Sequence, residues 1–76
     1  MIEELDRVVL TAAFPEERLE PGDVGTVVHV YADGQAYEVE FVTLGGETAA
    51  VLTVEKDQVR PVSGRDISHA REMAAR

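Results

Sequence analysis

Few side chains in this sequence could carry out chemistry, and they are scattered. The two histidines, His29 and His69, fall in separate predicted elements, a strand and a helix, with no Asp-x-His or His-x-x-x-His spacing around them. Zinc sites draw several ligands from cysteine, histidine and carboxylate side chains, and this chain has no cysteine. The sequence therefore predicts neither a metal site nor a bound cofactor.

A pair of carboxylates, Glu38 and Glu40, takes alternate positions of a predicted strand. Strand geometry places their side chains roughly 7 Å apart on one side. Such pairs act in acid–base catalysis when burial raises the pKa of one member. Here Tyr37, Val39 and Phe41 take the opposite side, so we expect that side to be dry and the glutamates to be solvated. An acidic patch for docking is the alternative role of the pair.

Nucleophilic catalysis has no good candidate. Ser63 and Ser68 lack a suitably placed histidine and acid, and Ser63 fits better as a helix N-cap. Lys56 is the only lysine, and no glycine-rich phosphate loop precedes a Lys-Ser/Thr pair. The sequence thus predicts a protein that is not an enzyme.

The charge balance bears on the class of partner. Fifteen acidic and seven basic residues give a formal net charge of −8. A polyanion gains nothing from counterion release off nucleic acid, so direct nucleic-acid binding is disfavoured. The acidic field favours encounter with a basic protein, and solubility alone is the simpler reason for it. A chain of 76 residues without disulfides has a small core, so a homo-oligomer is a further alternative.

Alternating and β-branched runs predict a mainly β fold. We expect five antiparallel strands in a small SH3-like barrel over residues 1–62, joined by a loop at 12–21 and by turns at 32–34, 44–47 and 55–58. The predicted strands are 5–11, 24–31, 35–43, 48–54 and 59–62. Gly25 favours a bulge or a sharp twist in the second strand. Pro61 cannot donate to a ladder, so the last strand should lie at an edge.

Residues 63–76 predict a separate element, a C-terminal α-helix from about 64 to 75. Ser63 and Asp66 have the spacing of a capping box. One apolar stripe runs along the helix, formed by Ile67, Ala70, Met73 and Ala74. That stripe is thin, so the helix should pack on the barrel or on a partner.

Neither a targeting segment nor a membrane span is predicted. The N-terminal Met1-Ile2-Glu3-Glu4 is acidic, and no stretch reaches the ~18 apolar residues that a membrane span needs. Together with the absence of cysteine, this favours a cytoplasmic protein without membrane contact.

A block of residues from Leu5 to Val62 resembles a family of short bacterial proteins known as domain-of-unknown-function family 4926. The matching residues are Leu5-Asp6-Arg7-Val8-Val9-Leu10, Pro15-Glu16, Gly22-Asp23-Val24-Gly25-Thr26-Val27-Val28, Tyr31, Tyr37-Glu38-Val39-Glu40-Phe41, Leu52-Thr53 and Val59-Arg60-Pro61-Val62. The resemblance implies no activity by name and favours an antitoxin or immunity role. The run from Gly22 to Val27 is also similar to the turn of KOW-type modules, from which this chain departs by its acidic charge.

Three functional hypotheses follow. The first is a non-catalytic protein-interaction module, and its more specific form is an antitoxin or immunity protein that masks a basic site on a partner. Its binding residues would be the acids Glu16, Glu17, Glu20, Glu38, Glu40 and Glu47, with Ile67 and Met73 as apolar anchors. The second is a KOW-like accessory domain that contacts RNA or a ribonucleoprotein through Arg7, Arg60 and Arg65. The third is a small enzyme or ligand carrier, which would need an apolar pocket holding His29 or a buried glutamate.

Overall fold

The computed structural model describes residues 1–73, and it is built almost entirely from β-strands. The five strands are β1 (Arg7–Leu10), β2 (Val24–Tyr31), β3 (Ala36–Val42), β4 (Thr48–Glu55) and β5 (Val59–Pro61). Three short 3-10 turns lie between them: η1 (Pro15–Glu17), η2 (Ala32–Gly34) and η3 (Lys56–Gln58). The five predicted strands are confirmed, and the turns predicted at 32–34 and 55–58 coincide with η2 and η3.

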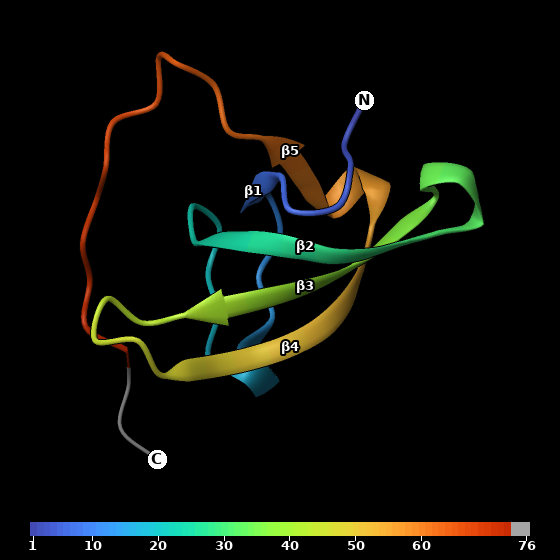
Figure 1. Cartoon of the computed structure of the whole chain (residues 1–76). Helices are drawn as coiled ribbons and strands as arrows, with labels where there is room; N and C mark the ends of the chain where they lie inside the picture. The colour runs from blue at the N-terminus through green and yellow to red at the C-terminus, as the bar shows by residue number, and fades with distance from the viewer. Residues whose placement is uncertain (74–76) are drawn as a thin grey trace.

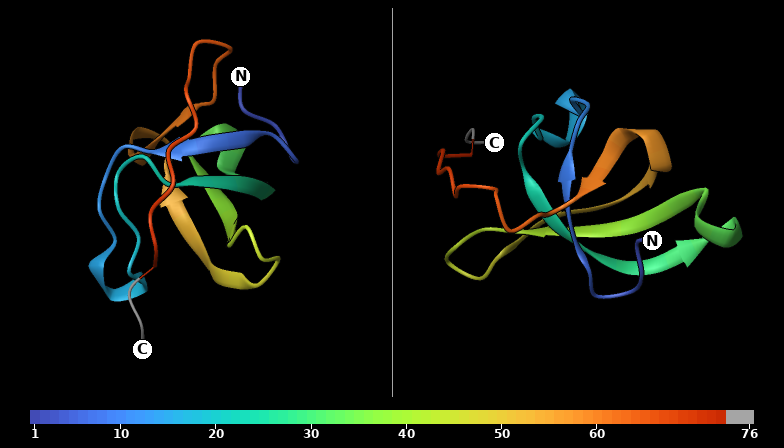
Figure 2. Two further views of the ribbon diagram at one scale, coloured as in Figure 1. Left: turned by 90° about the vertical axis from the view of Figure 1, so that its left-hand side faces the viewer. Right: turned by 90° about the horizontal axis from the view of Figure 1, so that it is seen from above.

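All five strands belong to one antiparallel sheet in the order β4-β3-β2-β1-β5. The sheet curves strongly, so that β1 and β5 lie behind the layer of β2, β3 and β4 (Figures 1 and 2). The two edge strands, β4 and β5, are not paired with each other. The sheet is therefore open, and the closed SH3-like barrel predicted from the sequence is wrong. Strand β5 has only three residues, and one of them is Pro61, which lacks an N–H. It therefore pairs with β1 on one side and has few backbone groups left to pair with β4 on the other.

The core is organised around the central strand β3. Tyr37, Val39 and Phe41 point inward, with exposed fractions of 5%, 0% and 3%. Around them pack the other members of the core cluster, which are Val8, Leu10, Leu19, Val27, Val54 and Val59. Glu38 and Glu40 lie on the opposite, outward side and are half-buried. The predicted division of this strand into one dry and one wet side is confirmed.

Gly25 lets two side chains of β3 lie directly against the backbone of β2. A Cβ atom at this position would lie 2.5 Å from Val39 Cγ1 and 2.8 Å from Phe41 Cε2. The lack of a side chain thus lets the Phe41 ring cover the β2 backbone. The irregularity expected near Gly25 falls a little later in the chain, where the β2–β3 register shifts between Val27 and His29. That bulge helps to bend β2 between the two layers.

The loop between β1 and β2 is tied to the core by two apolar side chains. Phe14 and Leu19 form an isolated antiparallel bridge, with backbone N–H···O distances of 3.0 and 3.1 Å. Leu19 is buried and Phe14 packs against the core cluster. Between them, Arg18 takes the left-handed region (φ 60°) that closes η1. The loop therefore presents η1 in a fixed place beside the sheet.

The predicted C-terminal helix is wrong, since residues 63–73 contain no helix and run as an irregular tail past one end of strands β2 and β3 (Figure 1). Ser63 and Asp66 close only a single turn, in which the Ser63 N–H donates to Asp66 Oδ2 at 2.7 Å. Arg60 also binds the Asp66 carboxylate, at 2.8 Å. With so thin an apolar stripe, side-chain packing does not offset the cost of helix nucleation. The predicted stripe residue Ala74 lies outside the described residues.

An arginine fixes the far end of this tail. Arg71 Nε donates to Asp23 Oδ1 at 3.0 Å. Arg71 Nη2 donates both to Asp23 Oδ2 and to the Arg18 carbonyl, the latter at 3.0 Å. Burial alone would raise the pKa of the Asp23 carboxyl, but the hydrogen bonds from Arg71 and from the Glu20 backbone outweigh it and lower that pKa. Met73 then packs against the core cluster. The tail is thus attached to its own domain through Arg71 and Met73.

The close approach at Gly25 yields a stability prediction. We expect Gly25→Ala to destabilise the protein by about 1–3 kcal/mol, because the new methyl group forces Val39 and Phe41 out of place. Urea unfolding followed by circular dichroism measures this change. Gly45→Ala is the matched control, since its Cβ would meet only Thr43 Oγ1 at 3.8 Å. Equal stability of the two variants would contradict the packing described here.

Candidate functional site

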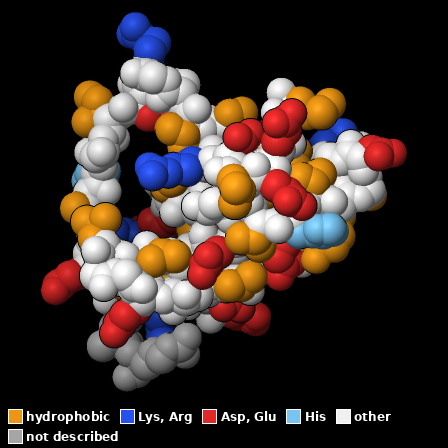
Figure 3. Space-filling model, viewed as in Figure 1, with side chains coloured by type: hydrophobic (Ala, Val, Ile, Leu, Met, Phe, Trp, Pro, Cys, Tyr) orange, Lys and Arg blue, Asp and Glu red, His pale blue; other side chains and the backbone are white. Residues whose placement is uncertain are grey.

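The outward side of β2, β3 and β4 carries the strongest candidate site. The β3–β4 register places Glu38 opposite Thr53 and Glu40 opposite Val51. On the other flank, the β2–β3 register places His29 opposite Glu38. Acidic and apolar side chains are interspersed over this face (Figure 3). We call it the outer face and define it by His29, Tyr31, Glu38, Glu40, Thr48, Val51 and Thr53.

Glu38 sits at the centre of the outer face and is held by two hydroxyl groups. Thr53 Oγ1 donates to Glu38 Oε1 at 2.7 Å, and Tyr31 Oη donates to the same oxygen at 3.2 Å. One donor comes from each neighbouring strand, so the carboxylate is fixed from both sides. Hydrogen bonds to an ionised acceptor are shorter and stronger than neutral ones, which accounts for the short Thr53 contact.

Glu40 is fixed in the same way by the end of β4. Thr48 Oγ1 donates to Glu40 Oε2 at 2.9 Å. Beside it, the Val42 and Val51 side chains are about half exposed. Within residues 1–73, no Lys or Arg nitrogen lies within 4.0 Å of the Glu38 or Glu40 carboxylate. The two charges are oriented by hydroxyl groups and are not neutralised by a cation.

An aromatic pair borders the carboxylates. The His29 and Tyr31 rings meet edge to face, with centroids 4.4 Å apart. His29 Nδ1 also lies 3.9 Å from Glu4 Oε2 in an exposed pair. Partial desolvation raises the pKa of the Tyr31 phenol above 10.0, and the charge of Glu38 and its hydrogen bond raise this pKa further. A protonated phenol therefore remains available to Glu38 as a donor.

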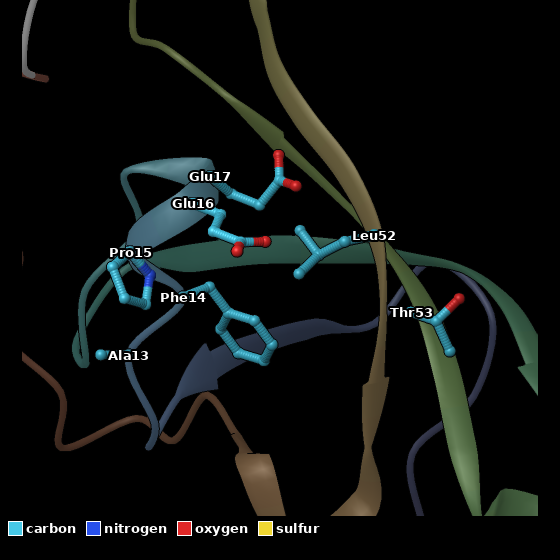
Figure 4. A pocket seen from close by; sticks show the side chains of 7 residues that line it. All are labelled: Ala13, Phe14, Pro15, Glu16, Glu17, Leu52 and Thr53. Carbon is cyan, nitrogen blue, oxygen red and sulfur yellow. The ribbon is translucent and has the colours of Figure 1, made fainter.

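A hollow of about 320 Å³ lies beside β4, between this strand and η1. Phe14 and Leu52 face each other across it, and the Glu16 and Glu17 carboxylates line the same side (Figure 4). Thr53 also lines the hollow, and its hydroxyl is the one that holds Glu38. The hollow, which we call the β4 hollow, and the outer face therefore lie on two sides of the same stretch of β4.

The remaining predicted binding residues do not join this site. Glu20 lies 3.6 Å from Arg71 and belongs to the anchor of the tail. Glu47 is exposed in the turn between β3 and β4. Ile67 is 90% exposed in the tail, and Met73 is used by the protein's own core. Of the eight predicted binding residues, the structure thus brings Glu16, Glu17, Glu38 and Glu40 together around β4 and places the other four elsewhere.

The arginines of the RNA hypothesis lie apart from the outer face. Arg60 on β5 is bound to Asp66, and this hydrogen bond, with one from the Ser63 backbone, lowers the pKa of Asp66 to about 2. Arg7 is on β1 and Arg65 is in the tail. RNA contact through these residues stays a prediction, and one of them, Arg60, already has Asp66 as an acidic partner.

The pocket required for the third hypothesis finds no support in either of two hollows. A second one, of about 300 Å³, lies between the N-terminus and η2 and is lined by Met1, Ile2, Glu3, Glu4, Val30, Asp33 and Gly34. His29 lines neither this hollow nor the β4 hollow. In the part of the chain that the structure covers, no three acidic or histidine side chains gather as metal ligands. Residues 1–73 also hold no helix long and apolar enough to cross a membrane.

Reasoning from the sequence missed the hydroxyl groups that fix the two glutamates. Tyr31, Thr48 and Thr53 came from strands whose register the sequence left open. Counting outward from the turn at 44–47 places Thr53 near Glu38, so hairpin register was the usable signal. The β4 hollow had no such signal, because it depends on where the β1–β2 loop folds back.

Comparison with known proteins gives one match. The family model described as "Domain of unknown function (DUF4926)" matches residues 4–61. This span runs from before β1 to the last residue of β5, so it contains the whole sheet. It confirms the resemblance found in the sequence. No curated protein and no solved structure matches the chain.

The contact between Tyr31 and Glu38 predicts a shifted alkaline titration. In a Tyr37→Phe background, ultraviolet absorbance reports Tyr31 alone, and we expect its pKa to lie above 10.0. Glu38→Gln should lower that pKa, because the charge that opposes phenolate formation is gone, while Glu40→Gln should leave it nearly unchanged. The contact stabilises the fold fully below pH 10 and is lost as the pH rises through the raised pKa. Equal titrations in all three proteins would refute the contact.

Proposed function

The chain belongs to the DUF4926 family over residues 4–61, and we propose that this member is a non-catalytic protein-interaction module that binds a basic protein partner. The proposal rests on one observation. Glu38 and Glu40 are oriented by hydroxyl donors at 2.7–3.2 Å, yet no cation among residues 1–73 pairs with them.

This arrangement supports recognition of a cation from outside. Each hydroxyl fixes a carboxylate without removing its charge, so binding a Lys or Arg requires little further ordering of these side chains. Half-exposed Val51 and Tyr31 supply apolar contact area next to the charges, as protein interfaces do. The face therefore offers both parts of an interface with a basic surface.

The net charge acts over a longer range. A formal charge of −8 on 76 residues attracts basic partners before contact and repels nucleic acid. Long-range attraction of this kind raises association rates and weakens with added salt. A strong salt dependence of binding is thus part of the proposal.

We extend the proposal to the biological role favoured by the sequence. An antitoxin or immunity protein of the cytoplasm would mask a basic site of its partner, and the preoriented glutamates suit that task. The order of four meandering strands, a 3-10 turn and a short last strand also suits an SH3-like domain with an open edge. Such small β-domains serve as binding modules without chemistry of their own.

The test is comparative capture from a lysate of the source organism. The wild-type chain, Glu38→Gln/Glu40→Gln and a matched control, Glu3→Gln/Glu72→Gln, are immobilised at equal density. Glu3 and Glu72 are exposed, so the control loses the same charge away from the outer face. We expect a basic protein on the wild-type and control chains that the Glu38/Glu40 variant retains at least tenfold less, with rising salt releasing it.

Equal retention of the same protein by all three chains would overturn the proposal, because the outer face would then not matter. An acidic or neutral captured partner would also contradict it. Thermal unfolding of each variant shows whether the fold is intact, and the amide side chains keep an oxygen that can accept the Thr48 and Thr53 hydrogen bonds.

A further inference from the structure

The two edges of the sheet differ in what they offer to another chain. On the β5 edge, Thr11 N–H donates to the Gln58 carbonyl and Val62 N–H donates to the Arg7 carbonyl. Alternation of an antiparallel ladder then turns the backbone groups of Val59 and Pro61 away from β1. Pro61 has no N–H to present there. This edge is short and blunted by proline, which is a common protection against strand pairing.

The β4 edge has the opposite character. Lys56 N–H donates to the Gln35 carbonyl, so the same alternation turns the backbone of Val51, Thr53 and Glu55 away from β3. Glu55 N–H donates to Gln58 Oε1 at 2.8 Å, so the stretch of unpaired N–H groups stops before Glu55. No other hydrogen bond within residues 1–73 reaches the outward backbone N–H of Val51 or Thr53. An eight-residue edge strand without proline or lysine is thus left open.

The β4 hollow lies along this open edge. Leu52 and Phe14 give it an apolar lining, and Glu16 and Glu17 give it an acidic rim (Figure 4). Glu55 lies on the outward side of the same strand, and Glu38 on the neighbouring β3 lies next to Thr53. A strand added here would place alternate side chains toward the hollow and toward the outer face.

We propose that the β4 edge binds an extended segment of the basic partner as a sixth strand of the sheet. Backbone hydrogen bonds from Val51 and Thr53 hold the segment. Its inward side chains are apolar and enter the β4 hollow beside Leu52. Its outward side chains are Lys or Arg and reach Glu55 and Glu38. This inference rests on the proposed function and names the binding mode.

Charge identifies the occupant as a basic segment and not a second copy of this chain. Pairing β4 with its own copy would bring the same acids, Glu16, Glu17 and Glu55, together from both molecules. Neighbouring like charges oppose association. A basic extended segment neutralises these acids and pairs with the same backbone groups.

The test uses the full chain and Val51→Pro. Proline at position 51 removes an N–H that faces away from β3, so the β3–β4 ladder keeps its hydrogen bonds, as at Pro61 on the other edge. The probe is an acetylated and amidated heptapeptide, Lys-Val-Lys-Val-Lys-Val-Lys, titrated by calorimetry at low salt. We expect Val51→Pro to bind about tenfold more weakly than Val51→Thr, which loses the same valine side chain but keeps the N–H.

A matched peptide with alternate backbone amides methylated controls for charge alone, because it keeps every lysine. We expect it to lose affinity for the wild-type chain. Equal binding of both peptides, or of Val51→Pro and wild type, would overturn the edge inference. A dimer of the free chain in sedimentation that Val51→Pro dissolves would overturn it as well, by showing that a second copy occupies the edge.

The two proposals fail in different ways. If the captured partner depends on Glu38 and Glu40 but binds Val51→Pro as it binds wild type, the edge inference fails and the proposed function stands. If neither substitution matters to that partner, both fail. Circular dichroism and thermal unfolding of Val51→Pro show whether the variant is folded.

Discussion

The structure depends on how closely β3 packs against β2 at Gly25. Because Gly25 has no side chain, the Phe41 ring and the Val39 Cγ1 methyl group lie directly on the β2 backbone. This contact, with the bulge between Val27 and His29, lets one sheet curve until β1 and β5 cover its inner side. A five-stranded sheet thereby encloses a core made mostly of valine, with no disulfide or α-helix among residues 1–73 to support it.

The same constraint determines what the surface can do. With Tyr37, Val39 and Phe41 turned inward, the intervening Glu38 and Glu40 must face outward on the central strand of the sheet. Their neighbours on β2 and β4 bring hydroxyl groups in place of cations. Since the curved sheet does not close, β4 also keeps a free edge next to these acids. Acidic face and open edge are thus consequences of one packing arrangement.

Much of this fold could be predicted from the sequence because strand alternation is a local signal. The period of two in Tyr37-Glu38-Val39-Glu40-Phe41 gave the dry and wet sides, and Pro61 gave the position of an edge strand. The C-terminal helix was predicted from a stripe at helical spacing, but Asp66 closes a turn with Ser63 and binds Arg60, and Arg71 binds Asp23. The Arg71–Asp23 pair joins residues 48 positions apart and has no local signature. The β4 hollow and the open sheet also depend on contacts between distant segments.

Hydrogen exchange of individual backbone amides, followed by NMR on the free chain, tests the central claim that β3 is fully enclosed while β4 keeps an open edge. The account predicts slow exchange for Val39 and Phe41, which exchange only when the whole domain unfolds. It predicts fast exchange for the outward amides of Val51 and Thr53, beside slow exchange for their neighbour Leu52. Protection of Val51 and Thr53 equal to that of Val39 would contradict the account, because the β4 edge would then already be covered.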